Sequence, residues 1–167
     1  MTVAELLAEA FGRIGPAAAA AVEGLPGELL TARPGPEANT MAWLLWHLAR
    51  VQDDHVADAA DREQVWISGG WAERFALPFD NRATGYGFSP EEVAQVRVDS
   101  PELLLGYLDA VTAVTLDFVR GLSGPDLDRV VDVAWDPPVT LGVRLVSVLS
   151  DDLQHVGQAA YLRGLLT

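Results

Sequence analysis

The sequence predicts an all-α protein, a four-helix bundle that forms a single domain over residues 1–167. Four long segments repeat apolar residues at the spacing of about 3.6 residues that buries one face of a helix. Capping residues or a first-turn proline precede these segments, and stretches rich in glycine and proline separate them. Half of the 167 residues are hydrophobic, so the chain can bury one core without disulfides.

The first helix is expected over residues 2–22. Thr2 and Glu5 have the spacing of a capping box, and apolar residues follow at helical period. Gly15 and Pro16 should kink or restart this helix, because proline has no N–H to donate within it. The glycine- and proline-rich residues 24–38 are expected to form a loop.

The second helix begins after Asn39 or Thr40, either of which can cap it, and runs to about Ala60 with His47 well inside it. A long connection over residues 62–88 follows, in which the pattern is irregular. A polar loop does not need many aromatic rings, yet this one contains Trp66, Trp71, Phe75, Phe79 and Tyr86. We expect these rings to cover one end of the bundle, where they either wall a pocket or simply anchor the connection.

A short helix is predicted at residues 89–92, Ser-Pro-Glu-Glu, which combine a capping-box spacing with a first-turn proline. Residues 100–102, Ser-Pro-Glu, repeat this signal. They begin the third long helix, whose apolar residues continue to Phe118.

The fourth long helix follows a loop at residues 121–138, in which residues 130–133 have the composition of a strand. Thr140 is its expected N-cap. Apolar residues at helical spacing extend this helix to about Gly164.

Composition excludes several kinds of chemistry. The chain has no cysteine, and all eleven of its basic residues are arginine, which excludes a protein thiolate nucleophile, a cysteine zinc site and a Schiff-base lysine. The net charge of −13, with scattered arginines, disfavours nucleic acid and anionic lipid as partners. There is no basic leader segment and no apolar run near the roughly 20 residues that span a bilayer. We therefore expect a cytoplasmic protein.

The most informative spacing is a carboxylate and an imidazole near the C-terminus. Asp151 and His155, at positions i and i+4 of an apolar helix, share one face of it, and Asp152 is also within reach. An unpaired buried carboxylate costs several kcal/mol, a penalty that a bound divalent cation offsets. We favour Asp151 over Asp152 because the i, i+4 geometry directs two side chains to a common point.

His47 is the candidate for a third metal ligand. His47 and His55 lie about 12 Å apart along their helix, too far for one ion to bind both. His55 lies among aspartates, where a surface imidazole is expected. His47, Asp151 and His155 would leave a fourth position open, as catalytic metal sites do. The alternative is that all three are only hydrogen-bonded core residues.

Three further residues are expected to contact substrate, namely Trp46, Tyr86 and Gln158. Gln158 lies one turn beyond His155 on the same face, where it can orient a bound water or a ligand carbonyl. Arg50 and Asp54 have the i, i+4 spacing of an ion pair, which we interpret as structural.

Two motifs resemble those of the DinB/YfiT-like superfamily, and most closely its DUF664 branch. They are residues 46–50, Trp-His-Leu-Ala-Arg, and residues 154–158, Gln-His-Val-Gly-Gln. The resemblance extends over nearly the whole chain and includes residues 39–43, 85–87 and 163–164.

The resemblance implies a four-helix bundle, frequently a homodimer, that holds zinc or nickel on three side chains. One ligand comes from the second helix and two come from the last helix at i, i+4, which gives His47, Asp151 and His155. Asp151 is a departure, because many members have histidine there and the mycothiol-dependent maleylpyruvate isomerases have glutamate.

Characterised members of the family use mycothiol or bacillithiol in isomerase or S-transferase reactions. The resemblance therefore implies a metal-dependent enzyme whose partners are a small-molecule thiol and a small electrophile. An open metal position can lower the pKa of such a thiol without any protein cysteine. The alternative is a non-catalytic module that binds a small molecule or metal in a stress response.

Overall fold

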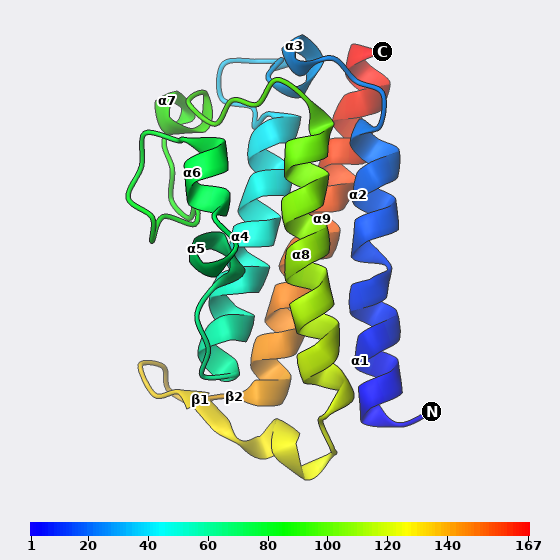
Figure 1. Ribbon diagram of the computed structural model, residues 1–167, viewed down its shortest axis with the longest axis vertical. Coiled ribbons are helices and arrows are strands. Elements are labelled where there is room, and N and C mark those ends of the chain that lie inside the picture. Colours follow the sequence, from blue (N-terminus) through cyan, green and yellow to red (C-terminus); the bar gives the residue numbers. More distant parts are fainter.

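The computed structural model describes residues 1–167 and is mostly helical, with one antiparallel pair of strands (Figure 1). Its elements are α1 (Val3–Gly12), α2 (Ile14–Val22), α3 (Gly27–Leu30), α4 (Met41–Ala59), α5 (Val65–Ser68), α6 (Trp71–Phe75), α7 (Pro90–Val93), α8 (Pro101–Arg120), η1 (Pro125–Asp128), β1 (Val130–Asp132), β2 (Val139–Thr140) and α9 (Leu141–Leu166). None of the helices combines the length and the apolar character needed to cross a membrane.

The predicted long helices are all present, and they lie side by side as α1–α2, α4, α8 and α9 (Figure 1). α4 packs against α8 and α9, and α2 packs against the same two helices. The strands are a small correction to the all-α prediction. β1 pairs with β2, with Val130 opposite Thr140, at the end of the molecule where α9 begins.

The first predicted helix is interrupted between α1 and α2, as expected from Gly15 and Pro16. The break falls at Arg13, three residues before Pro16. Proline cannot donate to the carbonyl of the residue four positions earlier, and its ring clashes with that carbonyl, which here belongs to Gly12. The disturbance is therefore placed one turn ahead of the proline itself.

The N-terminal caps of α4 and α9 are those predicted. The Thr40 hydroxyl accepts from the Trp43 N–H at 3.0 Å, and the Thr140 hydroxyl accepts from the Val143 N–H at 3.4 Å. α9 then continues without a break for 26 residues, slightly beyond the predicted end. This continuity keeps Asp151 and His155 on one rigid helix.

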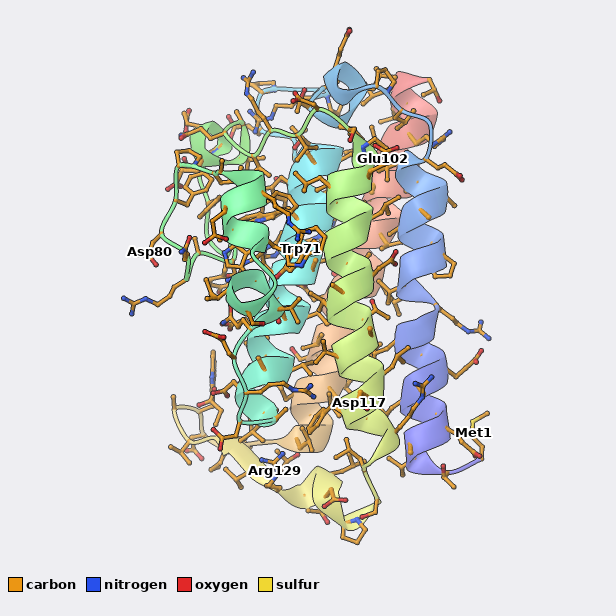
Figure 2. All side chains as sticks on the ribbon, viewed as in Figure 1. Met1, Trp71, Asp80, Glu102, Asp117 and Arg129 are labelled. Atoms are coloured by element: carbon orange, nitrogen blue, oxygen red, sulfur yellow. The ribbon has the colours of Figure 1, made fainter.

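The aromatic-rich connection lies along the side of α4 and α8, and not over one end of the bundle as predicted (Figure 1). Figure 2 shows Trp71 between α6 and α8, whereas Asp80 projects away from the helices. A Cβ atom on Gly106 would lie 3.0 Å from Trp71 Cη2, so glycine allows this ring to pack on α8. Most of the rings anchor the connection, and residues 41–50 of α4 are consequently all buried.

Arg50 is fully buried at the centre of this contact. Its Nε donates to the Ala83 carbonyl at 3.1 Å and its Nη2 donates to the Asn81 carbonyl at 3.2 Å. Its Nη1 donates to Gln64 Oε1 at 2.8 Å and to the Tyr107 hydroxyl at 3.3 Å. Arg50 therefore joins the connection to both α4 and α8.

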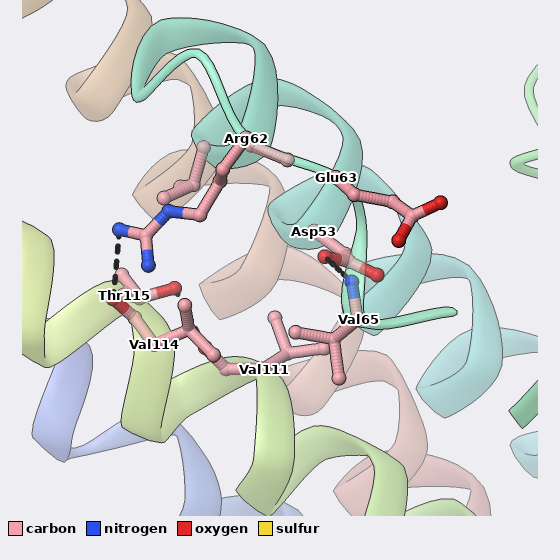
Figure 3. Close-up of a pocket in the computed structure, with 9 residues that line it drawn as sticks. Asp53, Arg62, Glu63, Val65, Val111, Val114 and Thr115 are labelled. Atoms are coloured by element: carbon pink, nitrogen blue, oxygen red, sulfur yellow. Dashed lines mark hydrogen bonds between the residues drawn. The ribbon is translucent and has the colours of Figure 1, made fainter. Parts of the chain in front are cut away.

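Asp53 balances the buried charge of Arg50 across 3.7 Å. Its carboxylate accepts from the Val65 N–H at 2.9 Å (Figure 3). It also accepts from the Trp66 N–H at 2.7 Å and from the Tyr107 hydroxyl at 2.8 Å. The predicted pairing of Arg50 with Asp54 is wrong. Asp53, three residues after Arg50, faces the core beside it. Asp54 lies nearer the surface and accepts from Gln64 Nε2.

Replacing Asp53 with alanine is expected to destabilise the fold by about 3 to 5 kcal/mol, because it leaves the Arg50 guanidinium buried without a counter-charge. Urea unfolding followed by circular dichroism measures this. Asp58→Ala, at an exposed position of the same helix, is the matched control and should change stability by under about 0.5 kcal/mol. Equal effects of the two substitutions would contradict the structural role of Asp53.

Candidate metal centre

The three predicted ligands come together between α4 and α9. One nitrogen of His47, one nitrogen of His155 and one oxygen of Asp151 all lie within 4.8 Å of one another. His155 Nε2 is 3.4 Å from Asp151 Oδ1, and the two imidazole ring centres are 4.9 Å apart. The helix of His47 thus contributes one side chain and α9 contributes two.

His47 is held in a single orientation by its surroundings. Its Nδ1–H donates to the Thr84 carbonyl at 2.5 Å, and the Trp43 ring stacks on its ring with centres 4.5 Å apart. Burial lowers the pKa of His47, and this effect outweighs the hydrogen bond to Thr84, so the ring is neutral at pH 7. The unshared electron pair is therefore on Nε2, where a metal would bind.

His155 is held in the same way. Its Nδ1–H donates to Gln158 Oε1 at 3.1 Å, and its Nε2 faces Asp151. Burial lowers the pKa of His155, but the hydrogen bonds to Asp151 and Gln158 and the charge of Asp151 together raise it above its usual value. Gln158 therefore orients a candidate ligand from behind.

The two neighbouring aspartates have different environments. Asp151 joins the two histidines, and its Oδ2 is buried without a hydrogen-bond partner. Asp152 is fully buried, is not part of the group, and has no partner for either oxygen. Burial, and then the charge of Asp151, raise the pKa of Asp152 well above its usual value, which favours its protonated form.

This donor set fits a divalent cation. Ligand atoms about 2.1 Å from a tetrahedral ion lie about 3.4 Å apart, which matches the 3.4 Å between His155 Nε2 and Asp151 Oδ1. Asp151 Oδ2 is a buried oxygen without a hydrogen-bond partner, and a bound cation would give it a partner. Two imidazoles and a carboxylate suit zinc and nickel among other metals.

A cavity of about 630 Å³ opens beside the three side chains. His47, Asp151 and Tyr86 line it, together with the Thr84 backbone segment that holds His47. His55 lines it too, which corrects the prediction of an ordinary surface imidazole. This volume is large enough for a small organic ligand to reach the candidate metal position.

The other expected substrate contacts are placed differently. Tyr86 stands 90% exposed at the cavity, whereas Trp46 is 1% exposed and its ring packs against Trp66, Phe79 and Phe88. Two residues at the site were not predicted from the sequence: Trp43, whose ring contacts both histidines, and Thr84, whose carbonyl accepts from His47. Trp43 lies one turn before His47 in the sequence, and this spacing could have identified it as a neighbour of that histidine. No feature of the nearby sequence indicated Thr84.

These features define a helical protein with a candidate divalent-metal centre at the wall of an open cavity. The sequence profile of the DinB superfamily matches residues 10–159, which include all three candidate ligands. The chain therefore belongs to the DinB superfamily.

The fold is also similar to a solved structure, that of the conserved protein of locus from Enterococcus faecalis. The two chains are 33% identical, the match covers 99% of this chain and 98% of that chain, and the TM-score is 0.92. No curated protein matches the sequence.

Replacing Gly85 with alanine is expected to lower zinc affinity about 10- to 100-fold, the usual effect of disturbing a residue behind a metal ligand. Gly85 has a φ of +91°, and a Cβ there would lie 2.9 Å from the Trp46 ring and 3.0 Å from His47 Nδ1. The clash would push the Thr84 carbonyl away from His47. Competition with a chromophoric chelator measures the affinity.

Gly87→Ala is the matched control for this substitution. Gly87 also has a positive φ, +73°, but an added Cβ would meet nothing within 4 Å. Its zinc affinity should remain close to that of the wild type. Equal losses in the two variants would show that loop strain, and not the contact with His47, governs affinity.

Asp152→Asn is expected to stabilise the metal-free protein more as the pH rises. The raised native pKa means that Asp152 keeps its proton when folded but loses it when unfolded, so wild-type stability falls by about 1.4 kcal/mol per pH unit between the unfolded and native pKa values. Asparagine removes this loss. Urea unfolding at pH 5 and pH 8 with chelator measures it, and Asp109→Asn, an exposed position, is the control. If the difference in unfolding free energy between Asp152→Asn and the wild type did not change with pH, the raised pKa of Asp152 would be contradicted.

Proposed function

We propose that the protein is a cytoplasmic, divalent-metal-dependent enzyme, a thiol S-transferase or isomerase that acts on a small electrophile. The metal, zinc or nickel, would be held by His47, Asp151 and His155. The convergence of these three side chains beside an open cavity is the observation that carries the proposal. We also propose that the fold is a four-helix bundle and that the protein forms a homodimer, as the sequence leads us to expect.

A divalent ion in this position supplies a Lewis acid that lowers the pKa of a thiol or a water at its open position. The protein residues provide the rest. The Thr84 carbonyl and Gln158 keep both Nε2 atoms directed at the same point. Trp43 packs against both imidazole rings and shields them from water. Tyr86 lines the cavity, which supports the proposal that it contacts a bound substrate.

The chemistry of the chain supports a thiol as co-substrate. No cysteine is present, so a sulfur nucleophile must arrive as a small molecule. The cavity of about 630 Å³ has room for such a molecule beside the candidate metal position. The resemblance to mycothiol-dependent enzymes makes mycothiol the first thiol to test.

The proposal predicts about one metal ion per chain after incubation with zinc or nickel and removal of unbound metal. Elemental analysis by mass spectrometry measures the content. His155→Ala and His47→Ala should lose most of it, because two remaining ligands hold an ion far more weakly. His55→Ala, in the same cavity but outside the ligand group, is the control and should retain it. A folded wild type that retains no metal would refute the metalloenzyme.

The same metal-loaded preparations then test turnover with mycothiol and monochlorobimane. The thiol sulfur would form a bond to the bimane carbon, chloride would leave, and the proton would pass to solvent. Faster fluorescent product formation by the wild type than by His155→Ala supports the enzyme. Thiol binding without turnover would favour the non-catalytic binding module instead.

A further inference from the structure

The cavity beside the candidate metal centre has a second end with its own composition. His47 and Asp151 line one part, while Asp54 and Asp58 of α4 line another. His47 lines this cavity, is only 4% exposed, and has no hydrogen-bond partner for its Nε2, so this nitrogen is free to bind a ligand. The charge of the far end therefore bears on which ligands can reach His47.

The one arginine that lines the cavity is already paired with a carboxylate. Arg144 of α9 donates from Nη2 to Asp132 Oδ2 at 2.7 Å, and only 16% of its side chain is exposed. Asp132 also accepts from the Ala134 N–H at 2.9 Å. This carboxylate fixes the guanidinium and offsets its charge, which weakens the attraction of Arg144 for an anionic ligand.

His55 adds no positive charge at neutral pH. Burial, and then the neighbouring Arg144 at 3.3 Å, lower its pKa, and these effects outweigh Asp54, Asp58 and Asp151. The ring is therefore a neutral part of the wall. It lies 3.8 Å from Asp54, and no cation is left in the cavity to balance the aspartates of α4.

Two carboxylates remain without a cation. Asp54 accepts a hydrogen bond from the neutral amide of Gln64, and Asp58 is exposed and forms no ion pair. Two aromatic rings line the same cavity from different segments. Tyr86 is 90% exposed and Trp135 is 66% exposed. Carboxylates beside open aromatic faces are the combination that binds organic ammonium groups.

We propose that the cavity binds a substrate with a positively charged ammonium group, seated among Asp54, Asp58, Tyr86 and Trp135 while its reactive end reaches the His47, Asp151 and His155 centre. This rests on the proposed function for the reactive end and adds the charge class of the substrate. Tyr86 and Trp135 contact the ammonium group through their ring faces, and the two aspartates act through charge.

The first test compares three thiols with the zinc-loaded wild type by isothermal titration. Thiocholine and 3,3-dimethylbutane-1-thiol have the same shape and differ only in charge, and 2-mercaptoethanesulfonate is the anionic probe. One ion pair about 6 Å long in a partly screened environment corresponds to about a tenfold change in affinity. Thiocholine should therefore bind about tenfold tighter than its neutral isostere, and the sulfonate should bind most weakly.

The double variant Asp54→Asn/Asp58→Asn should reduce this preference to about twofold while keeping the zinc content and the affinity for the neutral thiol. The control Asp109→Asn/Asp117→Asn removes the same two charges from exposed positions of α8, which does not line the cavity, and should keep the preference. Equal affinity for all three thiols, or tighter binding of the sulfonate, would overturn the proposal.

A second test does not depend on metal or thiol. Choline and 3,3-dimethylbutan-1-ol are titrated into chelator-treated protein, with the indole N–H signal of Trp135 observed by NMR. Choline alone should shift this signal at millimolar concentration, and the double variant should not respond. A choline response without thiol binding would refute the proposed function and keep the ammonium site. No choline response, or an equal one to the alcohol, would overturn the ammonium site whatever the thiols do.

Discussion

The buried guanidinium of Arg50 is the constraint on which the rest of the structure depends. A charge with no access to water must be surrounded by acceptors, and Arg50 finds them in Asp53, in Tyr107 and in the backbone of the connection. Because Ala83 is one of these acceptors, the neighbouring Thr84 carbonyl is brought to His47. α4 thus carries the candidate ligand His47 and, one turn later, Arg50, which fixes the segment that holds the Thr84 carbonyl against His47.

The connection and the site are two results of one packing arrangement. By covering the outer side of α4, the connection lets residues 41–50 of this helix be buried on every side, including at His47. Its chain then turns at Gly85, where only glycine fits against Trp46 and His47, and leaves Tyr86 at the cavity. The apolar anchoring of this segment and the polar wall of the candidate site therefore cannot be separated.

Local signals were sufficient for much of the fold and for the proximity of Asp151 to His155 on one helix face. The caps Thr40 and Thr140 and the interruption ahead of Pro16 were predicted because each depends on residues within about one turn. The grouping of Asp151 with His155 follows from i, i+4 geometry inside one helix. The partner of Arg50 was predicted wrongly, because spacing along a helix does not say which side of it is covered.

The sequence by itself determined where the long helices run, that any metal must be held by imidazole and carboxylate, and which three side chains were the candidates. Only the tertiary structure decided that Asp152 faces the core, that His55 joins the cavity, and that Asp132 pairs with Arg144. The physical reason is range. Helix signals act through neighbouring backbone groups, whereas these outcomes depend on contacts between distant segments, whose geometry is set by packing the whole chain.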